Sequence, residues 1–438
     1  MNIWPEFGFS QSLYATTPIR GTPEGRSLLV GRAEELRELK TILQSTALHP
    51  TIEGENGVGK TSLVAVAGYE LRRTFVLGND SKALIPIESS LQLTPEDTVA
   101  GFRRKVLFEI ARAFIDAADE LRQGGYEVPN TSDVRRWLSR AVQGQSGMGI
   151  SAAGFGGSVS RASSPNTSAG FSEAGFASEI ESWLRQTFPT AEHGGFLCII
   201  DNLELLGTLQ AARQLLESMR DSVLGLQGIR WVLCGSRGIV RTVVSSSRLE
   251  GRLATPMLLG ALPDTEVAEV VSARQRQYKI RDDAVAPVGH RGFRHLYDVL
   301  NRNLRNALKY ADDFALWLYM HESPPWNSEN VSRLLEVWLT DIADAHASET
   351  RIGRAAWAVF DGLIEMGGAC SPSDHESFGY DTPMALRPQV KALEDVNLVA
   401  SSVDESDKRR KTISVTPRGW LANYARSGYS MPSRIHSR

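Results

Sequence analysis

The sequence predicts an α/β protein: a doubly wound parallel sheet, then a helical segment, then a C-terminal winged helix-turn-helix. Two observations carry this prediction. Over the first 262 residues, short apolar runs alternate with helical patterns, as is typical of parallel strands covered by helices on both faces. Near the C-terminus, three helical patterns precede two β-like runs, which is the order of elements in a winged helix.

The strand candidates are short runs rich in Ile, Val and Leu. One leads into the glycine-rich stretch at 54–62, and the others are ALIPIESS (83–90), GFLCIIDN (195–202), IRWVLCGSR (229–237) and ATPMLLGAL (254–262). Helical spacing separates them, notably in TVAGFRRKVLFEIARAFIDAADEL and AARQLLESMRDSVLGL. Because ligands of such sheets bind at the carboxyl ends of the strands, we expect functional residues there.

The composition changes along the chain and suggests domain boundaries. We expect an extended arm at 1–27, anchored by aromatic residues and strapped over the first domain, a nucleotide-binding core at 28–262, a helical lid at 263–350, a winged helix at 351–425 and a tail at 426–438. A Gly/Ser-rich insert at about 144–175 interrupts the core. It could be a loop or hairpin that contacts a partner or DNA, or a tolerated surface insertion.

The composition is that of a globular protein whose net charge is too small to attract nucleic acid or membrane over its whole surface. The 438 residues carry a formal net charge of −3, so any surface that recruits a polyanion must be local. Cys198, Cys234 and Cys370 are far apart, and the first two stand in apolar runs typical of buried thiols. We find no leader and no apolar run of about 18 residues, and therefore expect a cytoplasmic protein without membrane contact.

The stretch GENGVGKTS matches the pattern G-x-x-x-x-G-K-[ST] between a short strand and a helix, which predicts a P-loop NTPase core. Backbone N–H groups of such a loop surround the phosphates of ATP. Lys60 would reach the β and γ phosphates, and the Thr61 hydroxyl would hold Mg²⁺. The expected phosphate-binding residues are Gly54, Glu55, Asn56, Gly57, Val58, Gly59, Lys60, Thr61 and Ser62.

Two acidic residues near the end of GFLCIIDNLE are candidates for the metal and for catalysis. Asp201 follows a buried strand, where binding Mg²⁺ would explain a carboxylate. Asn202 stands where many hydrolysing proteins carry a glutamate, and Glu204 is the nearest carboxylate that could orient the attacking water. Glu204 could equally be a solvated acid at a helix start. Hydrolysis is therefore less secure than binding.

Two arginines are candidates for sensing the γ-phosphate. Arg237 ends a strand expected beside the P-loop strand, and its alternative role is to cap that strand end. Arg305 lies in the lid pattern NLRNAL with Leu304 and Leu308 facing inwards, so it could reach the phosphates when the lid closes. An ordinary surface arginine is the other interpretation.

The C-terminal segment is locally basic, with ten Lys/Arg against five Asp/Glu from Thr382 onward. The candidate DNA contacts are Arg387, Gln389 and Lys391 at the start of the third helix, which Pro388 would open, and Lys408, Arg409, Arg410 and Lys411 at the tip between the two β runs. A winged module can also contact proteins, and an exposed turn is often charged for solubility.

The order of motifs resembles the AAA+ and STAND ATPases, especially the initiator type related to origin-recognition proteins. The matching segments are LLVGRAEEL, GENGVGKTS, FLCIIDNLE, WVLCGSRG, LLGALPDTEVAEVV and NLRNAL, within roughly residues 28–425. The resemblance implies adenine contact near Val30, Gly31 and Arg32, and a γ-phosphate sensor at Arg237. Asn202 and the long insert depart from the pattern and favour a slow ATPase or switch over a fast motor.

Three functions follow from these features. The first is an ATP-dependent protein that couples its nucleotide state to binding of double-stranded DNA. The second is a nucleotide-controlled signalling or oligomerisation switch that contacts protein partners and forms an ATP-dependent homo-oligomer. By resemblance, such a switch would fit bacterial antiviral systems or mobile elements. A small-molecule kinase is the weakest, because such enzymes need neither a lid nor a winged helix.

Overall fold

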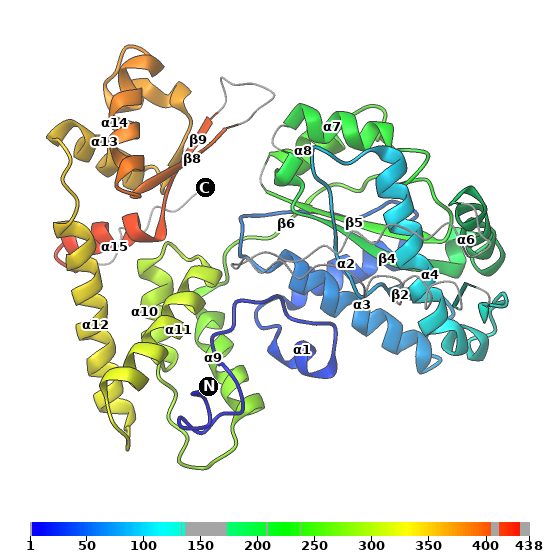
Figure 1. Cartoon of the computed structure of the whole chain (residues 1–438), viewed down its shortest axis with the longest axis horizontal. Coiled ribbons are helices and arrows are strands. Elements are labelled where there is room, and N and C mark those ends of the chain that lie inside the picture. The colour runs from blue at the N-terminus through cyan, green and yellow to red at the C-terminus, as the bar shows by residue number, and fades with distance from the viewer. Residues whose placement is uncertain are drawn as a thin grey trace, which may run out of the picture.

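The computed structural model describes residues 2–132, 134–135, 173–206, 209–236, 238–403 and 411–429, and of 173, 174, 209, 402, 403 and 411 only the backbone. Figure 1 shows the sheet and its helices on the right, a group of helices at the lower left and the small C-terminal module at the upper left. The expected insert therefore lies almost entirely outside the described residues.

The central sheet has six parallel strands in the order β2-β4-β5-β1-β6, with β3 paired to β4. The strands are β1 (Thr51–Glu53), β2 (Ala83–Pro86), β3 (Leu91–Gln92), β4 (Gly194–Asp201), β5 (Ile229–Gly235) and β6 (Met257–Leu258). This confirms the predicted sheet and places the end of β1, which leads into the P-loop, beside β5.

Alternate side chains of the strands enter two different cores, because successive residues of a strand point to opposite faces. Phe196 and Trp231 pack with α4 (Val99–Gln123), α6 (Glu173–Thr187) and α7 (Leu209–Ser218). The neighbouring positions Leu197 and Val232 pack on the other face with α2 (Ala33–Ser45) and α3 (Lys60–Val76). The sheet is thus covered on both faces, as a doubly wound fold requires.

The N-terminal arm binds a different part of the molecule from the one we predicted. Trp4, Phe7, Phe9, Leu13 and Tyr14 are buried with the helices that follow the sheet, not with the sheet domain itself. These helices are α9 (Asp264–Tyr278), α10 (His290–Val299), α11 (Leu304–His321) and α12 (Ser328–Ser348). The expected strap over the first domain is wrong for the aromatic part, because its apolar side chains find an apolar surface on the helices. The arm then ends in the short helix α1 (Pro23–Leu28).

The C-terminal module contains the three predicted helical segments and the hairpin in the predicted order, together with a strand after the first helix and a helix after the hairpin, which were not predicted. In chain order the elements are α13 (Arg354–Glu365), β7 (Ala369–Cys370), the 3-10 helix η4 (Pro372–Phe378), α14 (Pro383–Asp395), β8 (Val399–Val403), β9 (Lys411–Val415) and α15 (Pro417–Arg426). The strands form an antiparallel sheet in the order β7-β9-β8, and α13, α14 and the strands share one core.

The start of α14 differs from the prediction. The helix begins at Pro383, and the Thr382 side chain caps it by accepting a hydrogen bond from the backbone N–H of Ala385. Pro388 therefore lies inside the helix and not in its first turn. Arg387, Gln389 and Lys391 belong to the middle of α14 and not to its start, because a capping threonine with a proline directly after it sets the true N-terminus.

The last helix joins the module to the central helices. Trp420, Leu421 and Tyr424 of α15 belong to the core formed by the arm and α9–α12. The Tyr424 hydroxyl lies 2.9 Å from Nε2 of His295 on α10. The module is therefore in contact with the helical group through buried surface. In the part of the chain that the structure describes, no helix has the length and hydropathy needed to cross a membrane.

Candidate nucleotide-binding site

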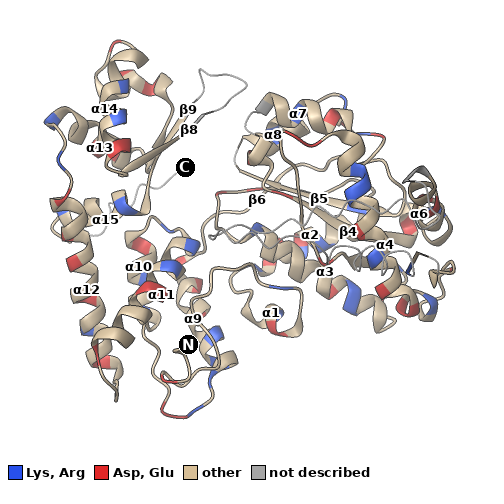
Figure 2. Cartoon of the chain, in the orientation of Figure 1, with Lys and Arg blue, Asp and Glu red and all other residues tan. Residues whose placement is uncertain are grey.

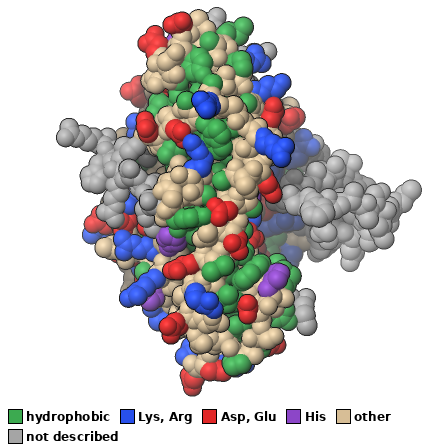
Figure 3. Space-filling model, turned by 90° about the vertical axis from the view of Figure 1, so that its left-hand side faces the viewer, with side chains coloured by type: hydrophobic (Ala, Val, Ile, Leu, Met, Phe, Trp, Pro, Cys, Tyr) green, Lys and Arg blue, Asp and Glu red, His purple; other side chains and the backbone are tan. Residues whose placement is uncertain are grey.

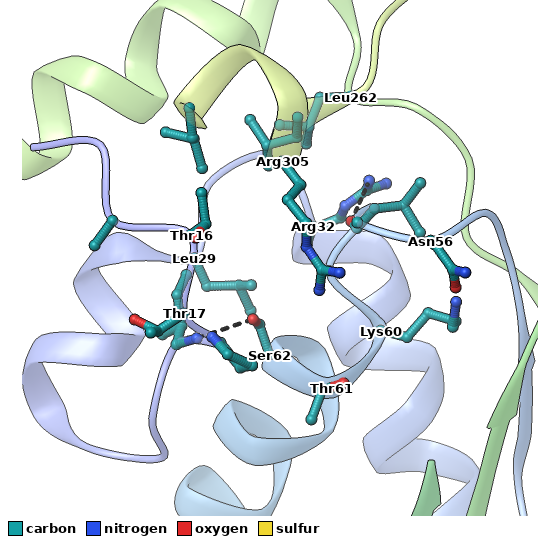
Figure 4. Close-up of a pocket in the computed structure, with 18 of the residues that line it drawn as sticks. Thr16, Thr17, Leu29, Arg32, Asn56, Lys60, Thr61, Ser62, Leu262 and Arg305 are labelled. Atoms are coloured by element: carbon teal, nitrogen blue, oxygen red, sulfur yellow. Dashed lines mark hydrogen bonds between the residues drawn. The ribbon is translucent and has the colours of Figure 1, made fainter. Parts of the chain in front are cut away.

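A pocket of about 320 Å³ lies where the P-loop, the N-terminal arm, α9 and α11 meet (Figure 4). The strands of the sheet end here, as predicted for a doubly wound fold. Its lining combines basic, acidic and apolar side chains from segments far apart in the sequence. The lining residues used below are Thr16, Thr17, Leu28, Leu29, Val30, Arg32, Asn56, Gly57, Lys60, Thr61, Asp201, Glu204, Val270, Arg274, Arg305 and Leu308.

The P-loop has the backbone that its glycines predict. Gly57 and Gly59 have φ values of 89° and 100°, a region that side chains with a Cβ rarely occupy. Directly after Gly59 the chain enters α3, whose first residue is Lys60. The free N–H groups at the start of this 17-residue helix are suited to bind an anion.

Lys60 is buried and held by the loop itself. Its ammonium group donates hydrogen bonds to the carbonyl oxygens of Gly54, at 2.9 Å, and Glu55, at 3.1 Å. A phosphate in the pocket would have to exchange with these carbonyls. Lys60 also lines the pocket, so its charge is available to a bound anion at short range.

Thr61 and Asp201 meet across the loop, although they are distant in sequence. The Thr61 hydroxyl donates to Oδ2 of Asp201 at 2.5 Å. Oδ1 of the same carboxylate accepts from the backbone N–H of Asn202, at 2.9 Å, and Asn202 has a positive φ of 56°. The turn at Asn202 thereby fixes the carboxylate at the end of β4.

Glu204 lies in the lining of the same pocket, in the 3-10 turn Leu203–Leu206. Its Oε2 accepts a hydrogen bond from the backbone N–H of Ser236, at 3.1 Å, just after β5. This bond ties the carboxylate to the strand beside the P-loop strand. Glu204 is half-buried in the first turn of this 3-10 helix and lines the same pocket as Thr61 and Asp201.

Helix α11 closes the pocket from the side opposite the sheet. Arg305, in its first turn, extends from α11 down toward the P-loop (Figure 4). The two backbones approach so closely that a Cβ on Gly57 would lie 2.7 Å from Cβ of Arg305. Asn303, the N-cap of α11, donates from Nδ2 to the carbonyl oxygen of Asn56, at 3.0 Å.

The three residues of the expected adenine-side segment play different roles. Val30 lines the pocket, whereas Gly31 does not and instead packs closely against Glu266. Arg32 is buried and bonded to protein atoms: Nη2 donates to the carbonyl oxygens of Gly260, at 2.6 Å, and Val58, at 3.2 Å. Its guanidinium therefore holds the P-loop in place through the Val58 carbonyl and also lines the pocket.

Two features of the pocket were missed from the sequence. The arm segment around Thr16 and Thr17 lines it, and the arm is tied to the P-loop helix by a hydrogen bond from the backbone N–H of Ile19 to Oγ of Ser62, at 3.0 Å. Arg274 of α9 also lines it. One signal was available, because Arg274 continues the apolar stripe of Val267, Val270 and Val271 at helical spacing.

Some candidate residues lie outside the described residues or away from the pocket. Arg237, Lys408, Arg409 and Arg410 lie outside them, and the side chain of Lys411 is not described. Arg387 and Lys391 are exposed on α14 in the C-terminal module, and Gln389 is half-buried. Cys198 and Cys234 are buried free thiols, as predicted, and Cys370 is a buried free thiol as well.

The donor set fits a magnesium ion that a nucleotide brings with it. Thr61 and Asp201 offer hard oxygen atoms, and Mg²⁺ usually takes one or two protein oxygens together with phosphates and waters. Among the described residues no three His, Cys, Asp or Glu side chains gather into a metal site that the protein could complete alone. Any divalent ion at this place would thus depend on phosphate oxygens.

No protein-family model and no curated protein matches the sequence. Among solved structures, the Aeropyrum pernix ORC1 protein in complex with DNA is 14% identical, with 92% of this chain and 96% of that chain covered and a TM-score of 0.41. The Aeropyrum pernix ORC2 protein in ADPNP-ADP complexes is 13% identical, with 96% and 99% covered and a TM-score of 0.45.

A third structure, Drosophila ORC bound to DNA, is 13% identical, with 95% of this chain and 92% of that chain covered and a TM-score of 0.35. All three structural neighbours are named as ORC proteins. At such identities and TM-scores they assign no role to any single residue of this chain.

Proposed function

We propose that the chain binds Mg·ATP in the pocket, hydrolyses it slowly, and uses its nucleotide state to control binding of double-stranded DNA by a C-terminal winged helix. One observation carries the first part of this proposal. Lys60, Thr61, Asp201, Glu204 and Arg305 come from the P-loop, β4, the turn after it and α11, and all five line one pocket. This is the set of groups that phosphoryl transfer to water requires.

Each group has a distinct task in that chemistry. Lys60 and the N–H groups at the start of α3 bind the phosphates, and Arg305 adds positive charge from the helical side as negative charge develops. A bound Mg²⁺, held by Thr61 and Asp201, would neutralise charge on the β and γ phosphates. Glu204 orients the attacking water and accepts its proton. The hydrogen bond from Ser236 holds the Glu204 carboxylate in place.

A short loop offers a route from the pocket to the C-terminal module. Asn303 contacts the P-loop carbonyl of Asn56, while Asn301, two residues earlier, donates from Nδ2 to the carbonyl oxygen of Gly367, at 3.3 Å. Both Asn301 and Arg302 have positive φ, so the loop is held in a restricted conformation. A nucleotide that moved the P-loop against α11 would shift this loop, and with it the base of the module.

The exposed face of α14 supports the DNA contact. Arg387 and Lys391 lie one turn apart on this face, and Leu386, Val390 and Leu393 on the other face fill the module core. Figure 2 shows basic residues on α14 in blue, and others are distributed over the rest of the chain. Figure 3, which faces the left-hand side of Figure 1, shows acidic and basic side chains mixed over that side of the molecule. The proposed DNA contact is therefore a local pair of basic side chains and not a broad basic surface.

An ATPase assay with and without duplex DNA tests the enzymatic half of the proposal. We expect slow hydrolysis by the wild-type protein, none by Lys60→Ala, and at least a tenfold loss with retained ATP binding for Glu204→Gln. If Glu204→Gln hydrolyses ATP at the wild-type rate, Glu204 is not the residue that positions water.

Fluorescence anisotropy with a labelled duplex tests the DNA half. The double variant Arg387→Ala/Lys391→Ala should bind the duplex more weakly. The slope of log K against log[salt] should also become shallower by about 2, because two phosphate contacts are lost. Arg333→Ala/Arg276→Ala, which removes two exposed arginines outside the module, is the matched control. Equal affinity of the α14 variant and the wild-type protein would exclude this helix as the DNA contact.

A nucleotide-controlled oligomer is the second candidate, favoured by exposed apolar side chains on the central helices. Leu316 and Met320 lie one turn apart on α11 and are 47% and 62% exposed. Such a pair is suited to contact a second protein surface. Light scattering without DNA, in ADP and in a non-hydrolysable ATP analogue, separates the candidates, since a nucleotide-driven rise in mass supports the oligomer.

A further inference from the structure

Arg274 is a buried cation without a partner. It lies in the third turn of α9 and is 7% exposed, and Nη1 is enclosed without a hydrogen bond. No hydrogen bond or ion pair joins its guanidinium to any of the described residues. Its electrostatic neighbours are the hydroxyl groups of Tyr14 and Tyr278, which stay neutral because burial raises the pKa of both.

Such an arginine destabilises the empty protein. Desolvation lowers the pKa of Arg274 to about 10, so the side chain remains charged at neutral pH. A buried charge that lacks hydrogen-bond partners costs free energy that folding must offset elsewhere. Such a group calls for an explanation, and a bound water, ion or ligand that supplies the missing acceptor is one.

The position of Arg274 indicates which part of a nucleotide it meets. The triphosphate end of the pocket is defined by Lys60 and Thr61. Thr16 and Leu29 line the opposite side of the pocket from Lys60 (Figure 4). Arg274 belongs to α9, which packs against α1 next to Leu29, and Val270 one turn earlier also lines the pocket. It therefore lies among the apolar residues and not among the phosphate ligands.

Resting on the proposed function, we infer that Arg274 recognises the nucleobase by donating hydrogen bonds to a ring nitrogen acceptor of adenine. A guanidinium offers only donors, and the acceptors of the adenine ring are N1, N3 and N7. The apolar side chains of Leu29, Val30 and Val270 are suited to pack on the faces of the ring. Arg274 would thus select for the base, whereas the P-loop binds the phosphates of any nucleotide.

Calorimetry with two ligands and two variants tests this inference. Arg274→Met should weaken Mg·ATP binding about tenfold or more, the loss expected for a hydrogen bond from a charged group, and leave binding of magnesium tripolyphosphate unchanged. The matched control is Arg276→Met on the same helix, where the arginine is exposed and paired with Glu269. The control should bind both ligands as the wild-type protein does.

Thermal unfolding without ligand adds a readout that a structural role would not give. Removal of an unpaired buried charge should leave the Tm of apo Arg274→Met equal to or above that of the wild-type protein. A lower Tm with unchanged ATP affinity would overturn the inference and make Arg274 a packing residue.

A ligand series on the wild-type protein keeps the inference testable if the variant does not fold. The probes are 1-deaza-, 3-deaza- and 7-deaza-ATP, each lacking one ring nitrogen, and at least one should bind about tenfold more weakly than ATP. Equal binding of all three would overturn the role of Arg274. Failure of the wild-type protein to bind ATP at all would instead overturn the proposed function.

Discussion

Two buried arginines border the same pocket, and their surroundings differ. Arg32, on the side of the sheet, is 5% exposed and bonded to Gly260, Val58 and Glu35. Arg274, on the side of the helices, is 7% exposed and has no such partner among the described residues. In this part of the chain, the arginine on the sheet side is paired without a ligand, whereas the arginine on the helical side lacks an acceptor. A nucleotide would therefore complete the helical wall, whereas at the P-loop its phosphates would exchange with the carbonyl oxygens that Lys60 binds.

The largest effect should come from replacing the paired arginine. Arg32→Met removes the ion pair of a buried arginine with the half-buried Glu35. It also leaves the buried carbonyl oxygen of Val58 and the half-buried carbonyl oxygen of Gly260 without their donor, so we expect the free energy of unfolding to fall by about 3–5 kcal/mol. Urea unfolding measures the loss. Arg274→Met, in the same assay, should cost nothing, and equal losses for the two variants would erase the difference between the two sides.

The second prediction uses another buried basic group on the sheet side. His49 has both ring nitrogens paired, with the Leu224 carbonyl and the Trp231 backbone N–H, and desolvation lowers its pKa to about 4. Unfolded His49 binds a proton near its ordinary pKa of 6.5 and folded His49 does not, so stability falls as pH drops from about 6.5 to 4. The loss should approach about 3 kcal/mol.

Urea unfolding at several pH values checks this prediction. His49→Gln, which keeps a donor and an acceptor, should flatten the curve between pH 6.5 and 4, and the exposed His290→Gln should not. An unchanged pH dependence in His49→Gln would mean that other groups cause the acid loss.

The third prediction probes the contact between the two sides. Gly57→Ala places a methyl group against Arg305 and strains a residue with φ of 89°, so we expect a loss of about 2 kcal/mol in stability and weaker ATP binding. Gly260→Ala is the control, because a Cβ there meets no atom within 4 Å. Equal behaviour of both variants would argue against close packing of α11 on the P-loop.

The smallest effect concerns the cap of α11. Asn303→Ala removes the cap and the bond to Asn56, and Asn327→Ala removes the equivalent cap of α12, which has no bond to the P-loop. Each should lose about 1 kcal/mol of stability. Calorimetry should show weaker ATP binding for Asn303→Ala alone. If both variants bind ATP as the wild-type protein does, the Asn303 bond does not help to close the pocket.

Local patterns predicted the sheet, and they indicated the P-loop residues and the carboxylate that the structure places in one pocket. The P-loop motif fixes Gly57, Gly59 and Lys60 within a few residues, and a carboxylate after an apolar strand indicated Asp201. Both signals lie within a few neighbouring residues of the sequence. Thr61 lies in the first turn of α3, after β1, and Asp201 ends β4. Because β5 lies between β1 and β4, their hydrogen bond depends on the strand order of the sheet and not on either motif alone.

The helical side could not be predicted in the same way. Arg274 stands on an apolar stripe, but the sequence does not reveal whether a carboxylate faces it. The aromatic residues of the arm could pack on either domain, because burial of apolar surface has no direction. The start of α14 was misplaced because two prolines, Pro383 and Pro388, competed for the first turn, and the capping bond from Thr382 decides between them.

The most direct test is isothermal titration calorimetry of the wild-type protein with ATP in the presence of Mg²⁺. The account predicts saturable binding of one ATP per chain, and an affinity about 100-fold lower for Lys60→Ala, which removes charged hydrogen bonds to the phosphates. Heats no larger than those of dilution, from folded wild-type protein, would contradict the account.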